Sequence, residues 1–265
     1  MKKTLAILLS LLMLLSVLCA CGADGGATAD ETSASADSSE LSAENIVQMY
    51  LNNASVWEVA DDSEWFYYLF VDLDFDGTLE LISSSGSGAD SNNRYFRLNP
   101  ADSSVTEITY SDKDTQSQWD FTGGDYPQLY KNNASGKLCY LVYDNIRTET
   151  MAGGMRIGEL TMNSDNSISS QNLWGFSYAS KDNTANGEFE FVYSIYEDGK
   201  EVEVNAEKYD KTLANYEQEN TKMALSFKLI EYANDTYTYT SLTKEAKYDL
   251  LLEAYNAFAY STTSQ

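Results

Sequence analysis

The residues best suited to chemistry lie in the segment FVDLDFDGTLEL, residues 70–81. Its carboxylates fall within nine residues of one another: Asp72, Asp74, Asp76 and Glu80. Carboxylates this close repel one another unless a cation neutralises them. Carboxylate and carbonyl oxygens are hard donors that select Ca²⁺ or Mg²⁺ over zinc, and a flexible loop favours the larger ion. The segment therefore predicts a structural calcium site, while a solvated acidic turn stays open as the alternative.

Two calcium-binding geometries can be compared with this spacing. An EF-hand requires a bidentate acid at the twelfth loop position and a helix on each side. Counted from Asp72, that position is Ser83, and the flanks YYLFV and LELIS have strand-like composition. The sequence therefore excludes an EF-hand and favours a loop between two strands.

The spacing of the acids resembles the DxDxDGxx[DN] calcium loop of FG-GAP and VCBS-type repeats. It is also similar to acidic segments of uncharacterised lipoproteins of Gram-positive gut bacteria. The resemblance implies carboxylate ligands at the first, third, fifth and ninth positions and a backbone carbonyl ligand at the seventh. On this sequence those positions are Asp72, Asp74, Asp76, Glu80 and Thr78.

Three positions of the loop bear on this resemblance. Gly77 permits the positive φ angle that lets such a loop wrap an ion. Phe75 stands where these loops usually have Gly or Asn, and a left-handed conformation costs it more. Glu80 is one methylene longer than the usual Asp. Phe75 and Glu80 are therefore the two positions at which this sequence departs from the calcium-loop pattern.

The first residues, MKKTLAILLSLLMLLSVLCACG, have the composition of an export signal. A short basic start precedes an apolar run, Leu5 to Leu18, that is too short to span a bilayer comfortably. The end of this run resembles the bacterial lipobox, with small Ala20 before Cys21. The resemblance implies that Cys21 becomes the lipidated first residue, whereas bulky Leu18 disfavours Cys19. An ordinary secretory signal is the alternative.

These features divide the chain into three parts. Residues 1–20 form a lipoprotein signal peptide, and residues 21–41 form a flexible linker whose small, acidic residues cannot build a core. Residues 42–265 form a single globular domain. The expected location is the outer face of the bacterial cytoplasmic membrane, with the membrane as a partner through the lipid anchor.

Composition excludes several functions. The 265 residues carry a net charge of −24, which disfavours nucleic acid as a partner. Histidine is absent, so imidazole acid–base chemistry, Ser-His-Asp triads and HExxH zinc sites are excluded. Once Cys19 leaves with the signal and Cys21 carries lipid, Cys139 is alone, and its apolar surroundings predict a buried, inert thiol.

Strand patterns dominate the domain, and helix patterns stand near both ends. Ser42, Asn205 and Thr243 are expected to cap helices, and Asp198-Gly199 predicts a type I′ turn in a hairpin. The segments ALSFKLIEY and TYTYTSL are predicted to close the fold as a strand pair. The fold class is therefore α+β and mostly β, an antiparallel sheet with one N-terminal helix and C-terminal helices.

The sequence favours a non-enzymatic surface module that recognises an extracellular glycan or protein. Trp119 and Trp174, in polar loops, are the best candidates for an exposed aromatic contact, although core packing is favoured for either one. Without His, the enzyme alternative is a carboxylate pair of the glycoside hydrolase type. A third hypothesis is an accessory subunit beside a transporter or envelope complex.

Overall fold

The computed structural model describes residues 41–59, 65–87, 90–110, 119–121, 127–149, 151–181, 188–233 and 239–261. Residues Leu41–Gln265 form one unit by their internal contacts. The predicted signal peptide, Cys21 and all but the last residue of the linker lie outside the described residues, so lipidation stays a prediction. In the described part of the chain, no helix has the length and apolar character needed to cross a membrane.

Strands make up most of the described residues, in line with the aromatic and β-branched runs of the sequence. They are β1 (Trp65–Val71), β2 (Glu80–Ser87), β3 (Asp90–Asn99), β4 (Ser104–Tyr110), β5 (Gln128–Asn132), β6 (Leu138–Glu149), β7 (Ala152–Met162), β8 (Ser167–Ser180), β9 (Phe189–Glu197), β10 (Lys200–Val204), β11 (Asn220–Lys222), β12 (Ala224–Ser226), β13 (Ile230–Ala233) and β14 (Ala259–Ser261). The mostly β fold class is confirmed.

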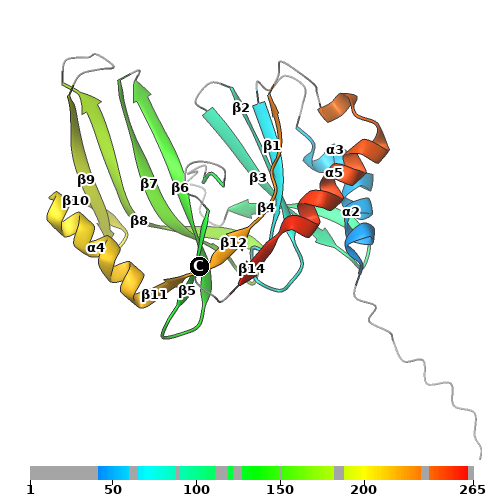
Figure 1. Ribbon diagram of the computed structural model, residues 1–265, viewed down its shortest axis with the longest axis horizontal. Helices are drawn as coiled ribbons and strands as arrows, with labels where there is room; N and C mark the ends of the chain where they lie inside the picture. The colour runs from blue at the N-terminus through cyan, green and yellow to red at the C-terminus, as the bar shows by residue number, and fades with distance from the viewer. Residues whose placement is uncertain are drawn as a thin grey trace, which may run out of the picture. The chain divides into compact units, whose positions relative to one another are not determined.

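Twelve of these strands belong to one sheet, and β12 pairs with β14 separately (Figure 1). The main order is β11-β5-β6-β7-β8-β4-β3-β2-β1-β13. Strand β8 is the junction: its start pairs with β4 in parallel, and its later residues pair with β9, which pairs with β10. The other pairings between the described strands are antiparallel, as predicted.

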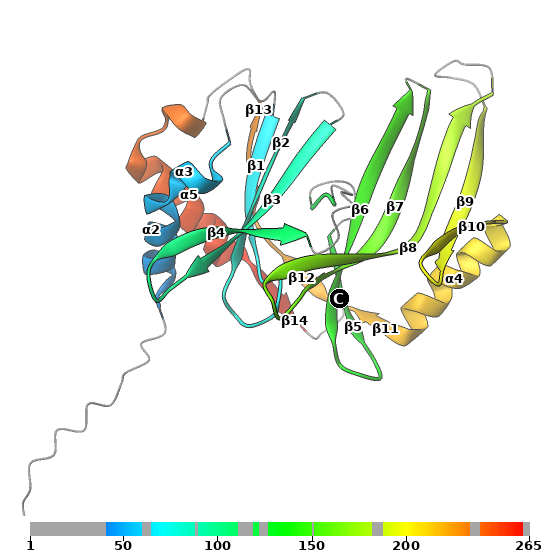
Figure 2. The same cartoon turned by 180° about the vertical axis from the view of Figure 1, so that it is seen from behind.

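The helices begin where the sequence places capping residues. They are α2 (Ala43–Asn52), the short α3 (Ala54–Trp57), α4 (Ala206–Glu219) and α5 (Lys244–Ala257). The side chains of Ser42, Asn205 and Thr243 each accept a hydrogen bond from a backbone N–H of the first turn. Helices α2, α3 and α5 lie beside β1–β3, whereas α4 lies beside β9 and β10 (Figures 1 and 2).

Three apolar clusters hold the described elements together. Alternate residues of β1, among them Phe66, Tyr68 and Phe70, pack against α2 and α5. The opposite face of β1, with Leu69 and Val71, meets side chains of β3, β6 and β8 in a second cluster. A third cluster packs α4 on β7–β9. The acidic loop follows β1 directly, so its first residues extend a strand that is buried on both faces.

The structure confirms the predicted hairpin turn but differs from the strand pair predicted for residues 224–242. Asp198 and Gly199 both have positive φ angles, as a type I′ turn requires. The prediction of a closing strand pair is only partly confirmed. The segment ALSFKLIEY does contain strand residues, in β12 and β13, but β13 pairs with β1. In TYTYTSL, residues 236–238 lie outside the described residues, and Tyr239–Ser241 form a short 3-10 helix. The aromatic side chain of Tyr239 is fully buried against the β1–helix cluster, which outweighs its strand preference.

Candidate metal centre

The acidic loop connects β1 to β2 at a point where their pairing register ends with Val71 opposite Glu80. The strand-loop-strand setting agrees with the sequence prediction. Glu80 is the first residue of β2, and Arg97 of β3 lies next to it, since the adjacent residues Leu81 and Phe96 are paired. Three consecutive strands of the sheet therefore fix the position of the acids and of one guanidinium.

Backbone N–H groups of the loop donate to the carboxylates and give it its shape. Asp72 accepts from the N–H groups of Asp76 and Gly77, both at 3.1 Å. Glu80 reaches back across the loop and accepts from the Leu73 N–H at 2.8 Å. The two acids are 2% and 0% exposed, so these bonds replace water at Asp72 and at one oxygen of Glu80.

Phe75 and Gly77 both adopt positive φ angles, +62° and +89°. Phe75 is therefore left-handed, a conformation that costs it more than it would cost Gly or Asn, and contacts of its aromatic ring offset this cost. The ring stacks on Tyr140, with centroids 5.1 Å apart, and Tyr140 also donates to the Asp72 carbonyl at 3.0 Å. A Gly or Asn at this position would make the turn more easily but would lose the stacking against β6.

Asp72, Asp74 and Glu80 each offer a carboxylate oxygen within 4.8 Å of the other two. These three residues, called the carboxylate triad below, could hold a metal ion. The Oε1 atom of Glu80 is buried and has no hydrogen-bond partner. A buried carboxylate oxygen without such a partner is costly, and a cation is the group that would satisfy it.

The other two predicted ligands have different surroundings. Asp76 is exposed, and its Oδ1 atom accepts from the Thr78 N–H at 2.7 Å. Its second oxygen contacts Arg97. Asp76 does not belong to the group of acids whose oxygens all lie within 4.8 Å of one another, so it is not part of the triad. Thr78 is half-buried, and the role of its carbonyl stays a prediction. The structure thus brings together three of the five predicted ligand residues.

The main feature that sequence reasoning missed is Arg97. Its Nη2 atom donates to Asp74 at 2.8 Å and to Asp76 at 2.7 Å, and its Nε lies 3.6 Å from Glu80 Oε1. Arg97 follows Glu80 by 17 positions and carries no local signal of this role. The only sequence feature that could have predicted its position beside the loop is the pairing of neighbouring antiparallel strands, whose side chains alternate between the two faces of the sheet.

Burial raises the pKa of Glu80 to about 8, although the Leu73 N–H opposes the shift. Burial also raises the pKa of Asp72 to about 6, and the neighbouring carboxylates of Asp76 and Asp74 add to it. These shifts show that burial disfavours the ionised forms of Asp72 and Glu80. A bound cation would reverse both effects by favouring the ionised forms.

The raised pKa of Glu80 does not make it a good candidate for a catalytic acid. Cavities of about 300 and 410 Å³ border the loop, and Glu80 lines neither of them. The larger is lined by Asp72 and Gly77 on one side and by Tyr255 and Tyr260 on the other. A carboxyl group that is 0% exposed and lines neither neighbouring cavity has no route to substrate through them.

Cys139 and the two candidate tryptophans belong to the core. The Cys139 thiol is buried, and burial raises its pKa to about 11, which agrees with the predicted inert role. Trp119 is fully buried and Trp174 is 6% exposed, so core packing is the correct interpretation of both. A methyl group at Gly158 would clash with the Trp119 ring, which shows how closely that ring packs on β7.

Among the residues that the structure describes, the most exposed large hydrophobic side chain lies on β9 instead. Phe191 is 49% exposed and Val192, beside it on the opposite face of the strand, is 40% exposed. Phe191 stacks with Tyr193 and contacts the rings of Phe176 and Tyr178 on β8. Helix α4 covers only the end of this strand near Tyr193.

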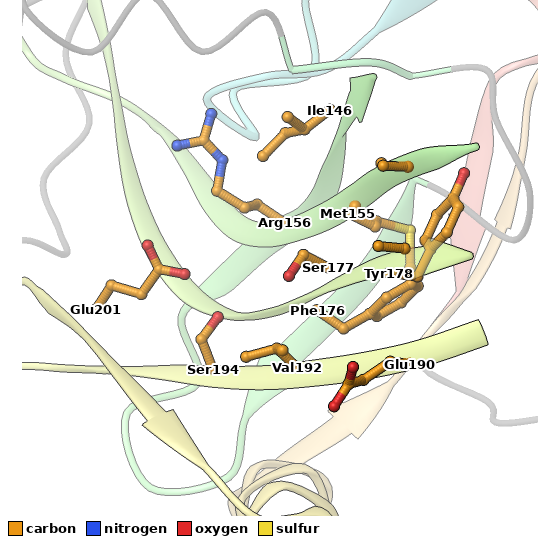
Figure 3. Close-up of a pocket in the computed structure, with 14 residues that line it drawn as sticks. Ile146, Met155, Arg156, Phe176, Ser177, Tyr178, Glu190, Val192, Ser194 and Glu201 are labelled. Carbon is orange, nitrogen blue, oxygen red and sulfur yellow. The ribbon is translucent and has the colours of Figure 1, made fainter. Parts of the chain in front are cut away.

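A cavity of about 450 Å³ lies among strands β6–β10, and its lining includes Phe176, Tyr178 and Val192 (Figure 3). Arg156 and Glu201 lie toward one end, and Glu190 lies toward the other (Figure 3). Arg156 is held by a salt bridge with Asp144. Val192, on the other face of β9 from Phe191, is therefore one of the residues that line this cavity.

Searches for similarity to protein-family models, to curated proteins and to solved structures found no match.

Proposed function

We propose that this chain is a lipid-anchored bacterial surface protein whose β-rich domain is stabilised by Ca²⁺ and contacts an extracellular glycan or protein. Its role is non-enzymatic. The observation that carries the calcium part is the buried Glu80 Oε1, which lacks a hydrogen-bond partner next to Asp72 and Asp74. Oxygen-only donors in a loop favour Ca²⁺ over transition metals and over the more rigid octahedral shell of Mg²⁺.

The role of the ion is structural rather than catalytic. The triad joins the end of β1 to the start of β2, and the loop backbone donates to the same carboxylates. An ion there would fix the β1–β2 connection and remove the repulsion between the acids. Burial of Asp72 and Glu80 leaves little of either carboxylate for a substrate.

The anchor is tested by replacing Cys21. Cys21→Ser is expected to release the protein into the medium or to leave the precursor unprocessed, because the serine hydroxyl cannot form the thioether to diacylglycerol. Cys19→Ser, two residues earlier, is the matched control and should remain in the membrane fraction. Fractionation and metabolic labelling with a fatty acid report both outcomes. If the two variants behave alike, the lipobox assignment is wrong.

The proposed contact surface is the aromatic group around Phe191. Aromatic side chains that stay exposed can stack on sugar rings or pack against a protein. The exposed apolar area on this strand favours a binding role, and no arrangement of the described residues gives comparable support to a catalytic role. Phe191→Ala should lower binding at least about tenfold, a typical loss for an aromatic anchor of roughly 1.4 kcal/mol or more.

The measurement compares wild type and Phe191→Ala on arrays of bacterial and host polysaccharides and on extracellular matrix proteins. Val56→Ala removes another exposed apolar side chain, 36% exposed on α3, and serves as the control. Both substitutions should leave the melting temperature almost unchanged, since surface changes usually alter stability by about 0.5 kcal/mol or less. If the wild type and both variants bind equally well, the contact surface does not include Phe191 and the proposal for β9 is wrong.

A further inference from the structure

We propose that Arg97 is the residue that sets the affinity of the calcium site, because a divalent ion binds only by displacing its guanidinium from the acidic loop. This inference rests on the calcium site proposed above. In the metal-free protein, the Arg97 guanidinium is the counter-ion of the acidic loop.

Arg97 uses the same acids that the proposed ion would use. Its guanidinium contacts Asp74 and Asp76 at 2.8 and 2.7 Å, and its Nε is 3.6 Å from Glu80 Oε1. Two of the three residues of the carboxylate triad are therefore in contact with Arg97. Its side chain is 24% exposed, so solvent screens these contacts only in part.

A guanidinium and a divalent ion cannot both remain at these distances without strong repulsion. An ion bound to a triad oxygen would stand about 2.3–2.6 Å from it. The Arg97 nitrogens lie 2.8 Å from Asp74 Oδ2 and 3.6 Å from Glu80 Oε1, so both cations would act on the same two carboxylates. Two cations this close repel strongly wherever the surroundings are partly buried. Binding of the ion must therefore include movement of the Arg97 side chain. The salt bridges that Arg97 then loses reduce the observed affinity for Ca²⁺.

Glu80 Oε1 shows that Arg97 is an incomplete replacement for the ion. At 3.6 Å the contact is an ion pair, and the buried Oε1 atom still has no hydrogen-bond partner. A planar guanidinium directs its N–H groups along fixed lines, and here they serve Asp74 and Asp76. A spherical ion has no such restriction and could contact all three triad residues at once.

A second contact of Arg97 gives an independent signal of its movement. Its Nη1 atom donates to Asn166 Oδ1 at 2.7 Å. Asn166 lies in the turn between β7 and β8 and has a φ angle of +61°. The Arg97 side chain therefore links the acidic loop to a turn far away in sequence, and displacement should change the environment of the Asn166 amide.

The test is calorimetric titration of the purified full-length chain with CaCl₂. Arg97→Gln removes the competing charge and should bind Ca²⁺ at least tenfold more tightly than the wild type. Arg97→Lys keeps the charge and should stay within a few fold of the wild type. Arg94→Gln is the matched control on the same strand, where the arginine pairs with Glu107 and not with the loop, and its affinity should equal that of the wild type.

The outcomes separate this inference from the site itself. If the wild type binds Ca²⁺ and Arg97→Gln binds equally or more weakly, the competition is refuted and the calcium site stands. If neither protein binds at millimolar Ca²⁺, the calcium site and this inference both fail. In the wild type, ¹⁵N NMR should show a calcium-dependent shift of the Asn166 side-chain amide, absent in Arg97→Gln; binding without that shift refutes displacement.

Discussion

Calcium in hundredfold excess over its dissociation constant should raise the melting temperature of the wild-type protein by about 5–10 °C at pH 7.5. A ligand at this excess adds about 2.7 kcal/mol to the free energy of unfolding, and each kcal/mol shifts the melting temperature of a domain of this size by about 2–4 °C. The increase should be absent in Asp74→Asn, because the variant loses one charge of the triad while keeping the shape of the side chain.

Asp102→Asn is the matched control for this experiment. Asp102 is an acid in another tight turn, where it accepts from the Ser104 N–H at 3.0 Å, and it is not part of the triad. Its calcium response should equal that of the wild type. Differential scanning calorimetry with CaCl₂ or a chelator measures all three proteins. If millimolar Ca²⁺ does not raise the melting temperature of the wild type, the calcium proposal is wrong. If the melting temperature of Asp74→Asn rises equally, the ion binds at another site.

The metal-free protein should become less stable as the pH rises from about 5 to 9. The pKa of Glu80 is about 8 in the folded protein and has its ordinary value of 4.5 when unfolded, so the folded state binds more protons between these values. Stability therefore falls across this range. Each unit of pKa difference corresponds to about 1.4 kcal/mol, so the total loss is several kcal/mol. Asp72, with a pKa of about 6, contributes in the same direction at the acidic end.

Glu80→Gln isolates this effect because the amide cannot ionise. In a chelator, urea denaturation from pH 5 to 9 should show a shallower fall for the variant, which becomes the more stable protein at the alkaline end. Calcium should reverse the trend in the wild type only, since the ion binds the ionised triad and competes with protons. Parallel pH profiles of wild type and variant would show that Glu80 is not the group that titrates.

Several features of the fold were predictable because neighbouring residues determine them. Ser42, Asn205 and Thr243 cap their helices through a side chain that reaches only to the first turn. Asp198-Gly199 forms its turn because both residues tolerate positive φ angles. The positions of Asp72, Asp74 and Glu80 in one loop follow from spacing alone, and so does the oxygen chemistry of the site.

Tertiary structure decided which of those acids lie together and which aromatic groups stay exposed. Arg97 reaches the loop because β3 pairs with β2, so the counter-ion comes from outside the motif. Trp119 is buried although its sequence surroundings are polar. Phe191 is exposed on an aromatic strand, since α4 covers one end of β9 and not the other. Local spacing specifies which chemistry a residue can perform. Burial and charge pairing depend instead on elements that are distant in the chain. They determine the free-energy cost of ionising each carboxylate and the exposure of each aromatic ring.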